Sequence, residues 1–147
     1  DQPLENIRIS NVQMHMTPEN AKDKRSSNAL KIENVQGLRI RDLSIKWDEG
    51  APEEKWQSAL VLRNVSDFVI DSFEGRQGLK NGSAPTIVLD NVSEGVVRNS
   101  RASDFAGVFI HVDGAESRNI VMRDNYVSKA KKDLTFGDKR LTKAVDK

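Results

Sequence analysis

Three titratable side chains lie in or beside one short, mostly apolar segment of the sequence and are the candidates for catalysis. Asp104 precedes residues 108–112, Asp113 follows them, and His111 lies two residues before Asp113. Enzymes that hydrolyse glycosidic bonds use two carboxyl groups several ångströms apart, one of them an acid with a raised pKa. The sequence allows such a pair here. The alternative is that Asp104 closes a turn while His111 and Asp113 lie on a solvated sheet face.

Arginine side chains recur at one position of a repeated segment and are the candidates for binding. Arginine holds a carboxylate through two parallel hydrogen bonds, so Arg41, Arg98 and Arg123 could form a cationic groove for uronate groups. The alternative is ordinary cross-strand support between opposite charges, worth about 0.2–1 kcal/mol per pair. We expect two outward columns, one of Ser10, Arg41, Asp71, Arg98 and Arg123, and one of Glu33, Arg63, Asp90 and Asp113.

Two tryptophans are the only ones in the chain, and they stand at the two ends of one loop, at Trp47 and Trp56. Sugar rings stack on aromatic faces, so both are candidates for carbohydrate contact. The alternative is that the two rings clamp the loop against the underlying structure. No metal site is expected, because the chain has no cysteine and its two histidines, His15 and His111, are far apart in sequence.

The elements that would position these side chains form an internal repeat, which predicts a solenoid. Each copy reads apolar, any, apolar, any, small polar, and alternation of this period excludes helices. Strands this short cannot each bury their own apolar face, but stacked coils bury them together. The five copies are residues 7–12, 38–43, 68–73, 95–100 and 120–125, and a second ladder comprises residues 29–35, 59–65, 87–92 and 110–113.

The repeat predicts an all-β chain folded as a right-handed parallel β-helix of about five coils over residues 1–128, with a C-terminal cap or tail at 129–147. The chain does not match a leucine-rich-repeat solenoid, because no helical half-repeat is present. An antiparallel sandwich is also disfavoured, because it would not place turn residues in columns. Asn, Asp and Ser should form two turn columns in the left-handed conformation. These are Asn34, Asn64 and Asn91, and Asn11, Asp42, Ser72, Asn99 and Asp124.

The matching phase of the copies also predicts the core. The apolar residues at corresponding positions should point inward in stacked columns, where each is covered by the coils on either side. The residues expected there are Leu30, Ile32, Leu60, Leu62, Ile87, Leu89, Ile40, Ile70 and Val97.

Composition excludes several classes of function. The net charge is +1, so no global basic field favours nucleic acid. The absence of cysteine excludes disulfides and thiol nucleophiles. No apolar run reaches the roughly 18 residues of a membrane helix, and no cofactor motif is present, so neither a membrane nor a cofactor is expected.

The first repeat begins at Leu4, with no coil before it to cover its apolar residues. The sequence starts at Asp1 without a signal peptide, and we expect it to be processed or cut from a longer protein. Terminal coils of a solenoid need a cover. We expect missing N-terminal coils of the same protein, or else a second copy of the chain, to cover the first coil.

Copies of Ala-Leu-x-Ile/Leu-x-Asn-Val followed by apolar-x-Ile-x-Asp/Ser-apolar resemble the C-terminal coils of pectin-acting β-helix proteins. The nearest family is the polygalacturonase family of glycoside hydrolases, and the resemblance covers roughly residues 4–127. It implies a polysaccharide substrate, acidic or neutral, and a secreted or periplasmic protein. It is a likeness of fold, and such ladders also occur in binding proteins.

The catalytic motifs of that family are missing from this chain. They are Asn-Thr-Asp, a paired Asp-Asp, Gly-His-Gly and Arg-Ile-Lys, and the nearest approach is Arg39-Ile40-Arg41 inside the repeat. We therefore expect the distal portion of a polysaccharide hydrolase, not catalytically complete by itself. The alternatives are a non-catalytic carbohydrate-binding or assembly module, and an independent enzyme with unfamiliar chemistry.

Overall fold

The structure is a computed structural model that describes residues 2–23 and 26–147 of the chain. Its regular elements are nearly all strands, and one short 3₁₀-helix, η1 (Lys139–Ala144), lies near the C-terminus. The strands of the described part are β1 (Leu4–Met16), β2 (Leu30–Trp47), β3 (Leu60–Gly75), β4 (Ile87–Arg98), β5 (Arg101–Ala102), β6 (Val108–Asp113), β7 (Arg118–Arg123), β8 (Lys132–Phe136) and β9 (Val145–Asp146).

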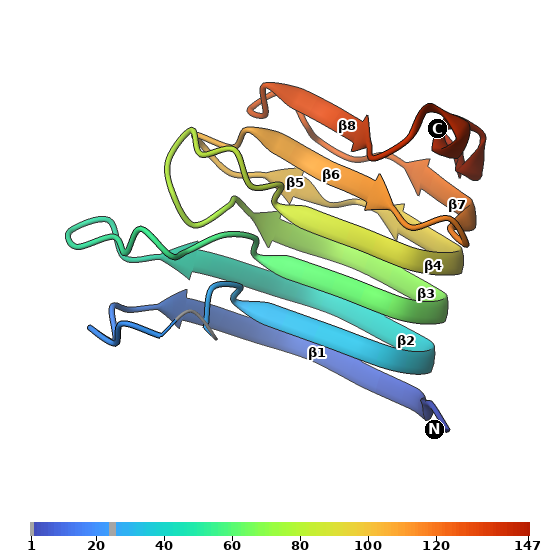
Figure 1. Cartoon of the computed structure of the whole chain (residues 1–147), viewed down its shortest axis with the longest axis horizontal. Helices are drawn as coiled ribbons and strands as arrows, with labels where there is room; N and C mark the ends of the chain where they lie inside the picture. Colours follow the sequence, from blue (N-terminus) through green and yellow to red (C-terminus); the bar gives the residue numbers. More distant parts are fainter. Residues whose placement is uncertain (1, 24–25) are drawn as a thin grey trace.

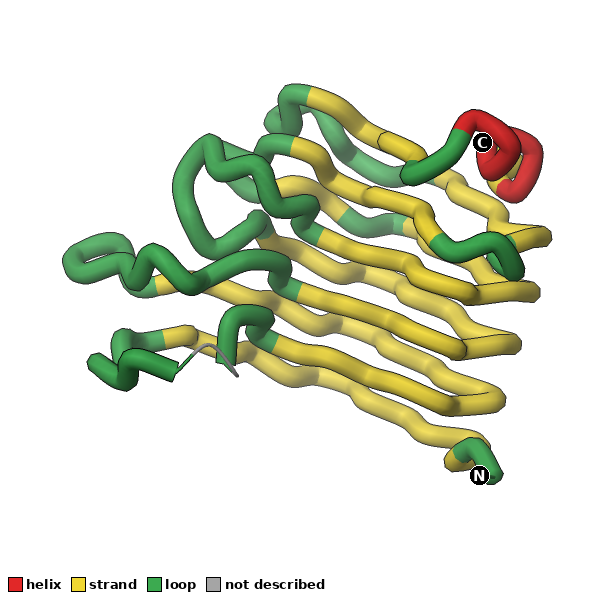
Figure 2. The backbone as a smooth tube through the Cα atoms, in the orientation of Figure 1, coloured by secondary structure: helices red, strands yellow, loops and turns green. Residues whose placement is uncertain are grey.

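The strands stack as a parallel β-solenoid of about five turns, which confirms the predicted fold. Strands β2, β3 and β4 each run along one face, bend sharply and return along the other face (Figure 1). We call these faces the front sheet (residues 30–33, 60–63 and 87–90 with β6 and β8) and the back sheet (residues 7–16, 38–47, 68–75 and 95–98 with β5, β7 and β9). The longer connections gather at the side opposite the bends (Figure 2).

The bends are made by residues in the left-handed conformation, where Asn and Asp are tolerated best. Both predicted turn columns are confirmed; Asn34, Asn64 and Asn91, for example, have φ of +59°, +55° and +51°. Each such residue lets two successive side chains point outward, so that the chain turns while its apolar side chains stay inside. A third column was not predicted, and it comprises Asn6, Gly37, Asp67, Glu94 and Asn119.

Apolar columns fill the space between the two sheets. Leu60, Leu62 and Ile70 are fully buried, as predicted. Leu30 and Ile32 also belong to these columns but are only partly buried, because no described strand covers them on the side away from β3. The core of the middle coils is therefore complete, and the core of the first coil is open on one side.

The C-terminal segment covers part of the opposite end of the solenoid. β8 extends the front sheet by pairing with β6, and β9 extends the back sheet by pairing with β7. Leu141 and Ala144 of η1 are each 6% exposed. The segment that was predicted as a cap or tail thus adds strands and a short helix over the last coil.

Candidate functional site

The two candidate catalytic carboxylates are separated by a whole strand. Asp104 lies in the turn before β6, in a depression at the loop side that Glu74 and Lys129 also line, whereas Asp113 ends β6 near the C-terminal helix. The strand from Val108 to Asp113 alone spans about 16 Å at about 3.3 Å per residue. Carboxyl pairs in glycosidases lie about 5 to 9.5 Å apart, so these two residues do not form such a pair.

His111 and the same carboxylates have local partners instead. His111 Nδ1 lies 2.7 Å from Thr135 Oγ1, and its Nε2 lies 3.6 Å from Asp113 Oδ2. The Gly114 amide donates to Asp113 Oδ1 at 2.9 Å. Asp104 forms an exposed ion pair with Lys129 at 3.3 Å. These contacts fit the alternative of turn closure and a solvated sheet face.

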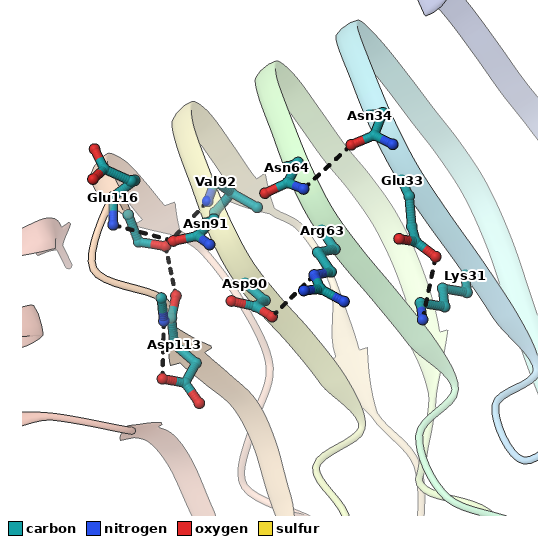
Figure 3. Close-up of polar contacts among 12 residues, drawn as sticks. Lys31, Glu33, Asn34, Arg63, Asn64, Asp90, Asn91, Val92, Asp113 and Glu116 are labelled. Atoms are coloured by element: carbon teal, nitrogen blue, oxygen red, sulfur yellow. Dashed lines mark hydrogen bonds and ion pairs between the residues drawn. The ribbon is translucent and has the colours of Figure 1, made fainter. Parts of the chain in front are cut away.

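The front sheet carries the second predicted column, and the strand register confirms it. Glu33 pairs with Arg63, Arg63 with Asp90, and Asp90 with Asp113. The ion pair between Arg63 Nε and Asp90 is 3.8 Å long and exposed, which limits it to about 0–1 kcal/mol. Figure 3 shows it beside the asparagine column, where Asn64 Nδ2 donates to Asn34 Oδ1 at 3.2 Å. This column holds three carboxylates and one arginine.

The back sheet carries the arginine column, which the register also confirms: Ser10, Arg41, Asp71, Arg98 and Arg123 are successive partners. A depression of about 600 Å³ lies over it, and we call this depression the arginine groove. It crosses four coils, a length of about 14 Å at about 4.8 Å per coil. Four arginines and two aspartates line it, with polar turn residues between them: Arg8, Arg39, Arg41, Arg98, Asp42, Asp71, Ser10, Asn11 and Ser72.

Asp71 fixes the orientation of Arg98 in the arginine groove. Arg98 Nε donates to Asp71 Oδ2 at 3.0 Å, while Ser72 Oγ and Asn99 Nδ2 donate to Asp71 Oδ1 at 2.8 and 3.3 Å. Burial raises the pKa of Asp71, but these three hydrogen bonds and the charge of Arg98 outweigh burial and lower it. Asp71 is therefore an anion at neutral pH that engages Arg98 through Nε. In the described part of the chain, no hydrogen bond or ion pair engages the two terminal nitrogens of Arg98.

Two other arginines of the groove have no partner among residues 2–23 and 26–147. No ion pair or hydrogen bond in that part of the chain engages the guanidinium group of Arg8 or of Arg41. Arg39 differs, because it donates to the carbonyl and to Oδ1 of Asp67. The groove thus presents unpaired positive charge on two adjacent coils.

Arg123 and Arg8 depart from what the sequence predicted. Arg123 belongs to the predicted column but lies outside the groove, and Asp146 of β9 binds its guanidinium group at 3.3 Å. Arg8 lines the groove but was not among the candidates. It pairs with Arg39 in a neighbouring outward column, and the repeated apolar-Arg-Ile pattern of the two strands was the signal for it.

The tryptophans are buried and expose no face for a sugar ring. Trp47 is 4% and Trp56 3% exposed, and their ring centroids lie 5.1 Å apart. Trp47 Nε1 donates to the carbonyl of Arg76 at 2.9 Å. A methyl group on Gly78 would lie 2.4 Å from Trp56 Cβ, which shows how closely the next loop approaches. The pair clamps the loop, as in the alternative interpretation.

Other kinds of site find little support in the described residues. No group of three or more metal-binding side chains gathers anywhere in that part of the chain. None of its helices has the length and apolar character needed to cross a bilayer. Comparisons with models of known families, with curated proteins and with solved structures found no match to this chain.

Proposed function

We propose that this chain is the acidic-polysaccharide-binding portion of a pectin-type, polysaccharide-acting protein, and that the arginine groove holds the carboxylates of the glycan. The observation that carries the proposal is the unpaired charge of Arg8 and Arg41 beside an oriented Arg98. Charge-assisted hydrogen bonds from arginine to carboxylate are about twice as strong as neutral ones. A polyanion that crosses the coils meets one such group after another.

The order of charges along the column favours binding of an anion. Asp71 is occupied by Arg98, Ser72 and Asn99, so it adds little repulsion to a ligand carboxylate. Its contact with Arg98 uses only Nε and leaves the terminal nitrogens of that side chain free to face a ligand. Arginine arranged in this way gives up less rotational freedom on binding than a free side chain does.

Catalysis is not part of this proposal. Asp113 ends β6 and Asp104 lies in the turn before that strand, and the motifs of the polygalacturonase family are missing from the sequence. The resemblance to the distal coils of that family supports a role in holding substrate. A polysaccharide ligand would also place the protein outside the cytoplasm.

Binding to polygalacturonate, with neutral dextran as the reference glycan, tests the proposal by isothermal titration at low and moderate salt. Arg41→Gln and Arg98→Gln should each weaken binding on the order of tenfold, the cost of about one charge-assisted hydrogen bond. Arg63→Gln is the matched control, since Arg63 and Arg98 are 52% and 49% exposed and each faces an aspartate through Nε, but on opposite sheets.

Two results would contradict the proposal. Equal losses from Arg63→Gln and Arg98→Gln would mean that the polyanion responds to net charge and not to the groove. Undiminished binding by Arg41→Gln and Arg98→Gln would remove the groove from the binding surface altogether. Binding should also fall as salt rises, because exposed charges are screened.

A further inference from the structure

The first coil leaves part of the apolar core uncovered. Leu4 is 63% exposed, whereas its partner in the next coil, Val35, is 3% exposed. Ile9 is half-buried, whereas its partner Ile40 is 1% exposed. The same contrast holds for every inward position of this end, which we call the open end; its side chains are Leu4, Ile7, Ile9, Val12, Met14, Met16, Leu30 and Ile32.

Unpaired backbone surrounds these side chains. β1 pairs with β2 on one edge, and no described strand pairs with its other edge. Among the described strands, the front segment at residues 30–33 likewise pairs with β3 alone. A long, flat strand edge beside apolar side chains is a template for another strand. The open end therefore presents what a further coil would need, namely a hydrogen-bonding edge and an apolar floor.

A second copy of the chain does not fit this surface. Head-to-tail stacking would need a matching strand edge on both sheets at the C-terminal end. Among the described strands β8 does leave its outer edge unpaired on the front sheet, but on the back sheet the 13 residues of β1 would meet only η1 and the two-residue β9. An inverted copy would lay its β1 antiparallel to this one, with the bend at Asn6 opposite the bend at Asn11. In that register Ile7, which points inward, would face Ser10, which points outward. Bends and apolar columns cannot both be matched, because side chains alternate along a strand.

We infer that the open end is the docking surface for another parallel β-coil, one that runs in the same direction as β1. The coil would place left-handed residues over Asn6 and Asn11 and apolar side chains over Ile7, Ile9 and Val12. This arrangement continues the register that already joins β1, β2, β3 and β4. The inference is independent of the arginine groove.

A fusion that supplies such a coil tests the inference. The variant replaces residues 1–3 by a copy of residues 30–64, so that the copied Asn64 is followed directly by Leu4. Leu4 then takes the place that Val65 has after Asn64 in the natural sequence, and Leu4, Val35 and Val65 are in register. The copied segment 35–47 would then lie against β1, and the copied segment 60–64 against residues 30–34. Amide hydrogen exchange of Ile7 and Ile9 should slow by about tenfold or more, because local opening would now break contacts on both edges.

The control carries the same copy after Lys147, beyond the covered end, and there the exchange of Ile7 and Ile9 should not change. Unchanged exchange in the N-terminal fusion, with a folded circular dichroism spectrum, would overturn the inference. A compact dimer of the unfused chain by light scattering, with Ile7 and Ile9 already protected, would also overturn it and assign the surface to a second copy. A fusion that fails to fold would overturn it too, since a matching coil should stabilise its neighbour.

Discussion

Gly95 leaves room for the ring of Phe68 in the neighbouring coil, and replacing it by alanine should force that ring out of place. The two residues are partners in the β3–β4 register. A Cβ atom on Gly95 would lie 2.0 Å from both Cε1 and Cζ of Phe68 and 2.5 Å from Cε2. Phe68 is 1% exposed, so displacing its ring would disturb the packed core around it.

The size of the effect follows from two opposed contributions. The φ angle of Gly95 lies outside the left-handed region, so alanine alone would stabilise the chain by about 0.4–1 kcal/mol through the unfolded state. Overpacking of a full core costs about 1–3 kcal/mol and occasionally more. Subtracting the first contribution from the second, we expect Gly95→Ala to lower the free energy of unfolding by up to about 2.5 kcal/mol.

A double-mutant cycle isolates the clash. Phe68→Leu removes the Cε and Cζ atoms that the new methyl group would meet, and in that background Gly95→Ala should be neutral or slightly stabilising. The coupling energy should then be about 1–3 kcal/mol, measured by urea unfolding with unchanged m-values. Additive effects of the two substitutions would refute the packing argument, because they would show that the methyl group and the ring never compete for space.

The remaining predictions address the core, a buried hydroxyl, pH and activity. Leu62→Ala should cost about 2–5 kcal/mol in denaturant unfolding, because the side chain is fully buried. Thr86 Oγ1 is buried without a partner, so Thr86→Val should raise stability by about 1 kcal/mol, and a loss in thermal unfolding would mean that the hydroxyl is satisfied. Folding lowers the pKa of Asp71, so the ionised side chain stabilises the fold at neutral pH. This stabilisation is lost as the pH falls from the ordinary carboxyl range through the folded pKa. The difference in unfolding free energy between the natural chain and Asp71→Asn should shrink over the same pH range. The chain should release no reducing ends from homogalacturonan above a buffer blank, and release that Asp113→Asn abolishes would restore the catalytic interpretation.

Much of the fold was predictable because the repeat records it directly. The apolar positions of each copy fix which side chains face inward, and the two predicted turn columns of Asn, Asp and Ser fix two of the bends. The third bend column escaped notice because its members differ in chemistry, from Gly37 to Glu94. A left-handed residue chosen for backbone geometry alone leaves a weak signal in a single sequence.

The candidate site was predictable only in part. Register placed Arg41 and Arg98 in one column, since each coil repeats the same outward position. Sequence spacing could not show that Asp71 would bind Arg98 and leave Arg41 unpaired, because that choice depends on side-chain geometry. Sequence spacing also suggested a carboxylate pair at Asp104 and Asp113, although the whole length of β6 lies between the turn that holds Asp104 and the strand end that holds Asp113.

The two ends of the chain lie at opposite ends of the stack (Figure 1), which determines how the protein would respond to mechanical force. A pull applied through the termini acts across the strands and loads the ladder of the outermost coil before any other. Such loading opens hydrogen bonds one after another, as in a zipper, and does not shear a whole strand at once. Because each coil contacts only its neighbours, extension should proceed in steps of one coil. The solenoid would then yield gradually under tension.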